Sequence, residues 1–485
     1  MTAAPPRTID CAYLILGSDQ PVAGRRRTIR IAGDKIDAVS GMSGEPQREM
    51  LALPALVNAH DHGRAVRTSS IGASGRPLES WLPLLSLIPS VDPYLAATVA
   101  LANSALGGAG AVMMHYTRVQ GFTDLPTEAA EVARAARDVG VRVGFAVAVR
   151  DQNPLVYGPS EPFLATLPAE IRPEIERRFM RTPLSPPQYL ALVDGVAAAA
   201  AGPMFDVQYG PQAVQWCSDA LLAAIAGASA QTRRRIHMHF LETRYQRVWA
   251  DATFPGGIVQ HLDSIGLLSP RLSLIHCVWA RPDELELLAA RGVTIVNNNS
   301  SNLHLRSGMA PVARMLERGC RLAIGIDGGA LDDDDDVLRE FRLAHLLHVG
   351  TGFKVATSRE QVLGMAFRNG RLSVTNIDDG GVIAAGAPAD LLLLDWAALD
   401  NDRLRVDADV LRVLFARATA RHIRELIVAG RTVVRDGAVL GVDLAAARAE
   451  VIGQMRAGVR DSAVLVSILA AYEQTLAAHF EPACC

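Results

Sequence analysis

The sequence has no surplus of basic charge. Its 485 residues include 48 Lys and Arg against 51 Asp and Glu, which gives a formal net charge of −3. Basic residues cluster only in two short triplets, at 25–27 and 233–235. Because nucleic acid and anionic membrane surfaces attract proteins through basic patches, neither is an expected partner. The expected partner is a small molecule.

The sequence also lacks paired cysteines and long apolar runs. Six cysteines are scattered along the chain without a Cys-x-x-Cys pair, which is typical of a reduced protein. The first residues contain no basic segment followed by an apolar stretch. No uninterrupted apolar run reaches the roughly 18 residues that a membrane span needs. We therefore expect a cytoplasmic protein without a transmembrane segment.

What the sequence does contain predicts a large globular protein. With 49% hydrophobic and 20% charged residues, the chain can form one large domain and an accessory one. Short strand-like runs separated by glycines fill residues 8–52, and similar runs recur at 389–395 and 423–434. We predict that the two ends of the chain, 1–52 and 381–440, together form a small β-sandwich domain.

Residues 53–380 alternate between short apolar runs and Ala- and Leu-rich helical stretches. Eight such runs, each followed by a candidate helix, indicate an α/β fold of the (β/α)8 TIM-like barrel type. In barrels of this kind the carboxyl ends of the strands carry the chemistry. The runs are the one before His60 and those at 111–114, 141–147, 205–209, 236–239, 272–276, 293–296 and 322–327.

The last part of the chain, 441–485, is predicted to be a helical tail. Its apolar positions include Val451, Met455 and Leu469 at spacings typical of an amphipathic helix. Such a tail packs either on the barrel or on a second subunit, so we expect a homo-oligomer.

Two histidines end the first barrel strand. Side chains at i and i+2 of a strand point to the same face, so His60 and His62 can present two imidazoles to one point in space. Two nitrogens that converge in this way suit a divalent metal. A His-x-His pair by itself is also common at an ordinary strand end, so the prediction depends on the other strand ends.

Three further strand ends carry residues of the same kind. The fifth run closes with His239, the sixth with His276 and the eighth with Asp327. Imidazoles and one carboxylate are the ligands expected of zinc or iron in a hydrolytic site. His237 precedes the strand end by one pleat, so we predict a packed position for it inside the barrel.

These motifs, in this order and spacing, resemble those of the amidohydrolase superfamily, in its cytosine deaminase-like and chlorohydrolase-like branch. The resemblance covers nearly the whole chain: the opening strands and the segments 54–81, 237–243, 276–327 and 386–391. It implies one divalent metal, zinc in the first place and iron as the alternative. The implied ligands are His60, His62, His239 and Asp327. It also implies that His276 lies beside the metal and that Glu242 faces the substrate.

The chemistry of such a site follows from its parts. A divalent cation lowers the pKa of bound water to about 7, and Asp327 can accept the proton that this water releases. Glu242 can protonate a ring nitrogen, and His276 can polarise the substrate or orient the hydroxide. We predict a hydrolase of a non-peptide C–N bond that deaminates an amino-substituted nitrogen heterocycle through metal-bound hydroxide.

Two alternatives to this function stay open. The same hydroxide could remove an alkylamine or a halide from a related ring. The protein could also be a non-catalytic barrel that binds a ligand, although the four ligands together with Glu242 argue against that reading.

Several positions depart from the usual pattern of the superfamily. Residues 297–302 read Asn-Asn-Asn-Ser-Ser-Asn where relatives often have His-Cys-Pro before Ser-Asn, and Gln212 stands where a histidine often follows Gly-Pro. The second barrel strand ends in an unusual His-Tyr-Thr-Arg at 115–118. We interpret these differences as an altered substrate pocket, with arginines that either bind an anionic or carbonyl-rich substrate or pack along the barrel rim. The predicted substrate contacts are Trp81, His115, Arg118, Gln212 and Asn302.

Overall fold

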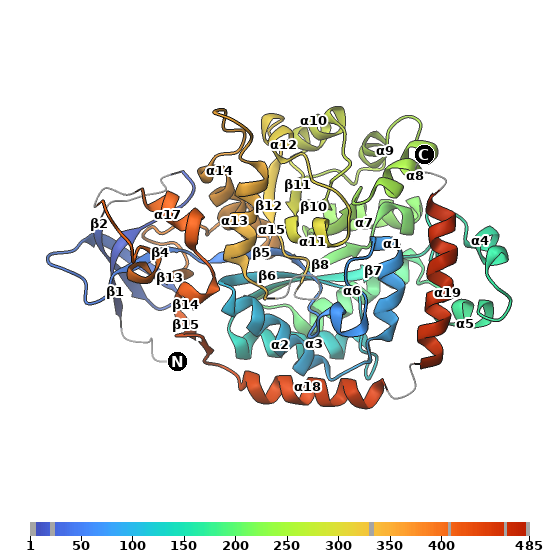
Figure 1. Ribbon diagram of the computed structural model, residues 1–485, viewed down its shortest axis with the longest axis horizontal. Coiled ribbons are helices and arrows are strands. Elements are labelled where there is room, and N and C mark those ends of the chain that lie inside the picture. Colours follow the sequence, from blue (N-terminus) through green and yellow to red (C-terminus); the bar gives the residue numbers. More distant parts are fainter. Residues whose placement is uncertain (1–5, 20–24, 329–333, 406–408, 460–462, 482–485) are drawn as a thin grey trace.

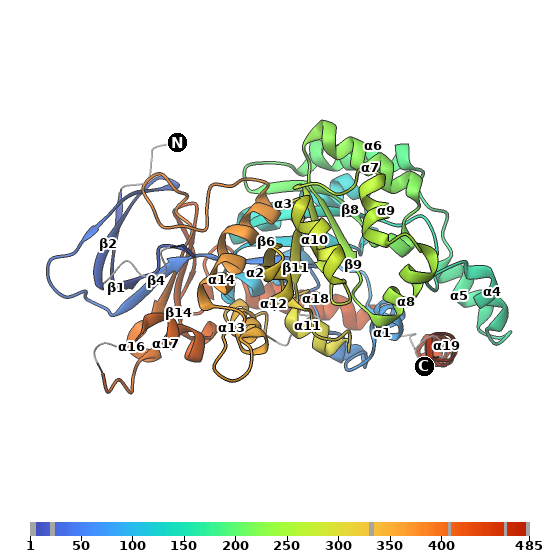
Figure 2. The same ribbon diagram turned by 90° about the horizontal axis from the view of Figure 1, so that it is seen from above.

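The computed structural model describes residues 6–19, 25–328, 334–405, 409–459 and 463–481. Two eight-stranded sheets organise them. Figure 1 shows a central barrel with the second sheet on its left and helix α19 (Ala463–Phe480) upright on its right. The view from above in Figure 2 has the same order.

The first sheet is the predicted barrel. Its eight strands follow one another in chain order, and each pairs in parallel with its neighbours. The Asp327 amide donates to the carbonyl oxygen of His60 over 2.9 Å, which connects the end of the last strand to the first. The strands are β5 (Leu56–Asp61), β6 (Ala109–Tyr116), β7 (Arg142–Val149), β8 (Phe205–Pro211), β9 (Ile236–Phe240), β10 (Leu272–His276), β11 (Thr294–Asn297) and β12 (Arg321–Ile324). The eight predicted runs and the (β/α)8 fold are confirmed.

Helices surround the barrel, and local signals set their ends. Helix α3, for example, begins where the Asp124 carboxylate accepts the Thr127 amide, and it ends at Gly140 with φ 99°, a backbone conformation that glycine adopts at little cost. The helices that follow the barrel strands are α2 (Pro93–Leu106), α3 (Leu125–Val139), α6 (Pro186–Ala200), α7 (Asp219–Thr232), α8 (Arg244–Thr253), α9 (Ile258–Ser264), α10 (Pro282–Ala290), α11 (Asn299–His304), α12 (Val312–Glu317), α13 (Val337–His348), α14 (Arg359–Gly364) and α15 (Gly370–Thr375).

The second sheet joins the two ends of the chain, as predicted. Strand β4 pairs in parallel with β1 on one side and antiparallel with β13 on the other. In sheet order the strands are β16 (Ala438–Val439), β15 (Arg431–Arg435), β14 (Ile423–Val428), β13 (Leu391–Asp395), β4 (Met50–Pro54), β1 (Arg7–Leu14), β2 (Arg25–Ala32) and β3 (Lys35–Gly41). The boundary expected after residue 52 cuts β4, because Leu53 and Pro54 pair with Leu392 and Leu391 of this sheet. Two helices, α16 (Trp396–Leu399) and α17 (Val410–Arg417), follow β13.

The remaining helices cover two surfaces of the barrel. One is the side opposite the second sheet, and the other is a flank of the barrel. Helix α1 (Leu78–Leu84) follows the first barrel strand, and α4 (Ser160–Thr166) and α5 (Arg172–Phe179) form an insertion after the third. The predicted tail forms two helices, of which α18 (Leu444–Gly458) packs on α2 through Val99, Ala447 and Val451. Helix α19 packs on α1 and the insertion. None of the helices in the described segments is long and apolar enough to cross a membrane.

Candidate active site

The four predicted metal ligands come together at the carboxyl end of the barrel. His60 lies in β5 and His62 directly follows it, His239 lies in β9, and Asp327 follows β12. The Nε2 atoms of His60 and His62 each lie 3.1 Å from Asp327 Oδ1. The ring nitrogens of His60, His239 and His276 form a second group, within which all ligand atoms lie within 4.8 Å of one another. His60 belongs to both groups, so the two groups adjoin each other at the carboxyl end of the barrel.

The other ring nitrogens of these histidines are already occupied. His62 Nδ1 donates to the His115 carbonyl oxygen over 2.9 Å, and His239 Nδ1 donates to the Gln212 carbonyl oxygen over 2.8 Å. In each ring Nε2 therefore carries the lone pair, and that of His62 lies 3.1 Å from Asp327 Oδ1. His60 Nε2 is buried and lies 3.1 Å from Asp327 Oδ1. Three imidazole nitrogens and one carboxylate that converge in this way fit a divalent cation such as zinc.

The charge states of these groups also fit a metal. Burial lowers the pKa of His60 to about 4 and the pKa of His239 well below its usual value, so both rings are neutral and able to coordinate. Burial alone would raise the pKa of Asp327, but the His60 and His62 imidazoles hold it well below its ordinary range. Asp327 is therefore a carboxylate at neutral pH.

His237 lies behind the cluster and supports it. Its Nε2 atom is 2.8 Å from Nδ1 of His60, and its side chain is fully buried inside the barrel. A ring in this position fixes the orientation of the His60 imidazole. His237 thus occupies the packed position inside the barrel that the sequence predicted.

Glu242 and His276 face each other beside the cluster. Glu242 Oε2 lies 3.5 Å from His276 Nε2, and Glu242 Oε1 accepts the Ser307 hydroxyl over 3.3 Å. Burial, with the negative charges of Asp327 and Glu79, raises the pKa of Glu242 well above its usual value. This shift favours the protonated form of Glu242, which can donate a proton.

The backbone at these strand ends is strained. Leu241, His276, Cys277 and Asp327 adopt positive φ angles of 45°, 75°, 49° and 68°, which non-glycine residues rarely do. Such conformations cost about 1–3 kcal/mol each and concentrate at functional sites. Here they turn the chain sharply, so that Glu242 and His276 both reach the cavity.

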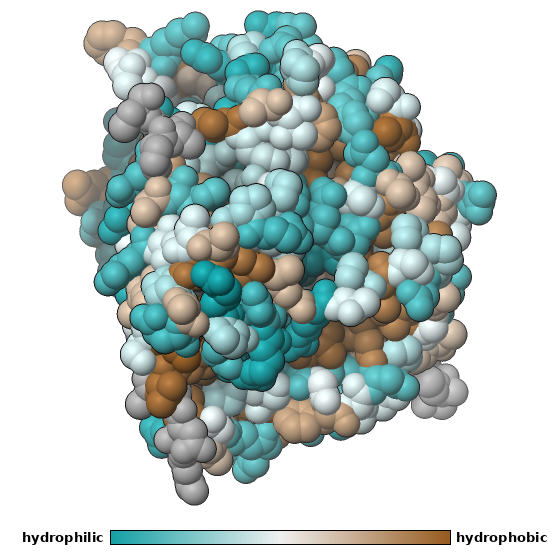
Figure 3. Space-filling view, turned by 90° about the vertical axis from the view of Figure 1, so that its right-hand side faces the viewer, coloured by the Kyte–Doolittle hydropathy of each residue, from teal (hydrophilic) through white to brown (hydrophobic). Residues whose placement is uncertain are grey.

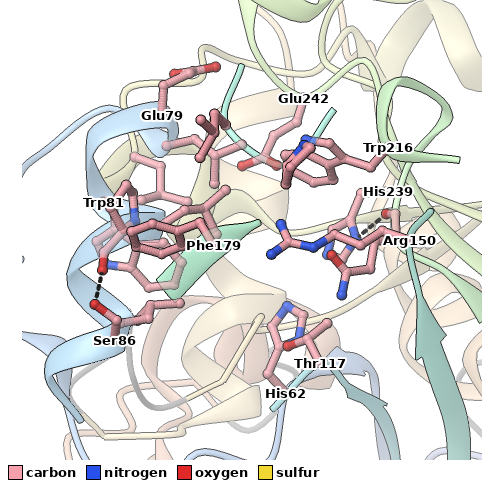
Figure 4. Close-up of a pocket in the computed structure, with 18 of the residues that line it drawn as sticks. His62, Glu79, Trp81, Ser86, Thr117, Arg150, Phe179, Trp216, His239 and Glu242 are labelled. Carbon is pink, nitrogen blue, oxygen red and sulfur yellow. Dashed lines mark hydrogen bonds between the residues drawn. The ribbon is translucent and has the colours of Figure 1, made fainter. Parts of the chain in front are cut away.

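A cavity of about 280 Å³ opens above the cluster. Figure 4 shows His62, His239 and Arg150 directed into this space. Three of the predicted substrate contacts, Trp81, Arg118 and Gln212, line the cavity. Two nitrogens of the Arg118 guanidinium donate to the Leu85 and Ile88 carbonyl oxygens, so Arg118 also holds the chain that follows α1.

The other two predicted contacts, His115 and Asn302, are not among the described residues that line the cavity. Both are buried behind it. His115 supplies the carbonyl oxygen that orients His62, and Asn302 Oδ1 accepts the His276 Nδ1 proton over 2.8 Å. Their placement corrects the expectation of direct substrate contact, and we treat them as positioning residues.

The polar residues that line the cavity and that sequence reasoning missed include two charged ones, Arg150 and Glu79. Arg150 follows β7, and it forms no ion pair or hydrogen bond with the described residues. Glu79 Oε1 accepts the hydroxyls of Tyr157 and Thr243 over 2.7 and 2.6 Å, while Oε2 is buried without a partner in the described part of the chain. The position of Arg150 at the end of the third barrel strand was the available signal, and Glu79 stands two residues before Trp81.

The chain matches the model of the amidohydrolase family over residues 51–433. Its relatives include the 5′-deoxyadenosine deaminase of Methanosarcina mazei, with 34% identity over 236 residues, which is 48% of this chain and 54% of that protein. The match thus spans about half the length of that relative. The 5′-deoxyadenosine deaminase of Methanothermobacter thermautotrophicus is 29% identical over 394 residues, with 79% of this chain and 84% of that one covered. The 5-methylthioadenosine/S-adenosylhomocysteine deaminase of Moorella thermoacetica is 27% identical, with coverage of 93% and 98%.

Two solved structures share the fold. An adenosine deaminase from Xanthomonas campestris with bound zinc has a TM-score of 0.74 at 24% identity, and the match covers 93% of this chain and 98% of that one. A mutant of the atrazine chlorohydrolase of Arthrobacter aurescens, complexed with zinc and atraton, has a TM-score of 0.77 at 22% identity, with coverage of 92% and 99%. At these identities the comparison establishes the barrel and its accessory sheet.

Proposed function

The chain belongs to the amidohydrolase family, and from this premise we propose that it is a metal-dependent hydrolase that deaminates an amino-substituted nitrogen heterocycle. One observation carries the proposal. Glu242, with a raised pKa, and the carboxylate Asp327 line the same cavity as His276. A proton donor and a proton acceptor therefore lie side by side where a ring can enter.

The residues that would hold the metal are His60, His62, His239 and Asp327. We propose zinc, with iron as the alternative, because imidazole and carboxylate ligands suit either ion. When bound, a divalent cation supplies Lewis-acid chemistry that makes water a nucleophile near neutral pH.

Different side chains carry out the proton transfers. Asp327 accepts a proton from the attacking water, and Glu242 donates one to the ring nitrogen next to the attacked carbon. The His276 Nδ1–H donates a hydrogen bond to Asn302 Oδ1, so the Nε2 lone pair can accept a hydrogen bond and orient the water. After water has added across the C=N bond, the exocyclic amine takes the proton held by Asp327 and leaves as ammonia. The proton of the added hydroxyl returns to Glu242, which leaves the oxo ring.

The substrate class that fits best is an aminopurine or a ring of similar size. The relatives are named as deaminases of 5′-deoxyadenosine and of methylthioadenosine or S-adenosylhomocysteine. The cavity wall offers Trp81 and Trp216 for stacking. Arg150 and the Glu79 Oε2 atom offer polar contacts to groups attached to the ring.

A screen for ammonia release tests the function. The zinc-loaded protein is incubated with aminopurines, aminopyrimidines, pterins and aminotriazines, beside Glu242→Gln and the exposed control His304→Ala. We expect at least one ring to release ammonia, with turnover at least 100-fold lower in Glu242→Gln at unchanged zinc content, and unchanged in the control. Turnover that survives Glu242→Gln, or release of chloride or alkylamine without any ammonia, would contradict the proposal.

A further inference from the structure

The C-terminal helix α19 forms a wall of the active-site cavity. Leu469, Tyr472, Leu476 and Phe480 are exposed by only 1, 2, 2 and 8%. Their spacing of three or four residues places them on one face of the helix. Tyr472 and Phe480 also line the cavity above the metal ligands, more than 140 residues after Asp327 in the sequence.

Ring contacts hold this face of α19 in place. Tyr472 stacks on Phe179 of α5 with ring centroids 5.8 Å apart and an interplanar angle of 18°. The Phe480 ring lies 5.2 Å from the Tyr157 ring, and Tyr157 in turn lies 6.0 Å from Trp216. The aromatic side chains of α19 are therefore continuous with those of the insertion after β7.

A polar contact beside this face also holds the helix. Arg76, which precedes α1, forms an ion pair with Glu473 of α19. Val464 and Val466, exposed by 70% and 49%, lie away from the cavity. Figure 3 views this side of the molecule and shows small apolar patches alternating with hydrophilic ones. The apolar face that α19 buries is the one that faces the cavity.

The cavity thus has two ends of different chemistry. The inner end carries the imidazoles and carboxylates of the catalytic cluster. The outer part is lined by six aromatic side chains, which are Trp81, Tyr157, Phe179, Trp216, Tyr472 and Phe480. A volume of about 280 Å³ is close to the lower bound of about 300 Å³ for pockets that enclose drug-sized ligands.

We propose that α19 completes an aromatic compartment that binds an apolar or aromatic substituent carried by the heterocycle, and that Tyr472 and Phe480 determine specificity for it. The proposal rests on the proposed function only for the identity of the ring at the inner end. Stacking and apolar burial favour such a substituent, because six aromatic rings line this part of the cavity. The C-terminal helix would then select substrates without touching the reacting atoms.

Paired ligands test this proposal by binding rather than by turnover. The probes are adenine with 9-benzyladenine and cytosine with 1-benzylcytosine, whose dissociation constants are measured by calorimetry on the zinc-loaded protein. The variants are Tyr472→Ala and Phe480→Ala, with Tyr472→Phe as the conservative change and the exposed Val464→Ala as the control. Circular dichroism and thermal unfolding check that each variant is folded.

We expect the benzyl form of at least one ring to bind at least 10-fold more tightly than the bare ring. Tyr472→Ala and Phe480→Ala should reduce this ratio to less than 3-fold, and Tyr472→Phe and Val464→Ala should preserve it. A ratio near one for both rings in the unmodified protein, or a ratio that the alanine variants leave unchanged, would overturn the proposal. Ammonia release is scored separately, so a compartment that binds without deamination would contradict the proposed function alone.

Discussion

His60 and Asp327 are joined twice. The Asp327 amide donates to the His60 carbonyl oxygen over 2.9 Å, and the Asp327 Oδ1 atom lies 3.1 Å from His60 Nε2. One residue ends the first barrel strand and the other follows the last. The candidate metal site therefore lies at the seam where the barrel closes.

Metal removal should destabilise the whole barrel for this reason. A cation held by both residues would link β5 to the end of β12, and a ligand that binds only the folded state stabilises it by about 2.7 kcal/mol at a concentration 100 times its dissociation constant. We expect the melting temperature to fall on chelation and to rise again with added zinc. In His62→Ala the melting temperature should depend much less on zinc. An identical melting temperature with and without zinc would show that no such link exists.

Replacing His237 should weaken metal binding without unfolding the protein. The ring lies 2.8 Å from His60 Nδ1, and partners of this kind typically contribute 10- to 100-fold in metal affinity. We expect His237→Gln to raise the zinc dissociation constant by that factor, measured by competition with a chromogenic chelator. The exposed His304→Ala serves as the control. Equal zinc affinities for all three proteins would show that His237 does not support metal binding.

Removing the Ser307 hydroxyl should change the pH profile. The hydroxyl donates to Glu242 Oε1 and lowers the pKa of this carboxyl, which burial raises. Ser307→Ala removes a bond to the ionised form, so the pKa of Glu242 should rise further. Because the proton donor is lost when Glu242 ionises, the alkaline limb of kcat/KM should move to higher pH. A limb that stays in place or moves to lower pH would argue against Glu242 as the donor.

Asp206→Asn should stabilise the protein at neutral pH. Burial raises the pKa of Asp206, in β8, from its ordinary value of 3.8 to about 6. The folded state thus binds this proton more tightly than the unfolded state, and stability present below pH 3.8 is lost as the pH rises to about 6. At 1.36 kcal/mol per pKa unit, the loss is about 1 to 3 kcal/mol. The amide can still accept the Gln208 side chain, which now lies 2.9 Å from Asp206 Oδ2.

Denaturant titrations at several pH values measure this effect. The difference between Asp206→Asn and the unmodified protein should grow between pH 4 and 6 and stay constant above that range. The exposed Asp34→Asn is the matched control and should show no such growth. A constant difference across all pH values would assign the effect to something other than the charge of Asp206.

The barrel strands were predictable because the evidence for them is local. Each buried parallel strand is a short apolar run, and His60, His239, His276 and Asp327 stand at or just after the ends of such runs. The expectation that polar residues at strand ends face the cavity was wrong for His115. It lies in β6 with its side chain fully buried, so it is a strand-end residue that supports His62 and does not line the cavity.

What sequence reasoning missed depends on contacts between distant segments. Nothing near Tyr472 or Phe480 in the sequence indicates that α19 reaches the cavity, because an amphipathic helix has the same pattern wherever it packs. The sequence likewise does not indicate that Arg150 lines the cavity, since a charged residue after a strand can lie in solvent or in a cavity. The joining of the two chain ends was predicted, but the exact pairing of β4 with β13 was not, because these strands lie more than 300 residues apart.

That pairing has a consequence for how the protein is made. Strand β4 cannot find β13, nor His60 its partner Asp327, until most of the chain has left the ribosome. At about 5–20 residues per second, synthesis of the intervening segments takes on the order of ten seconds to a minute. Throughout that interval the nascent chain carries exposed apolar strand edges, which makes newly made copies of this protein candidates for chaperone binding.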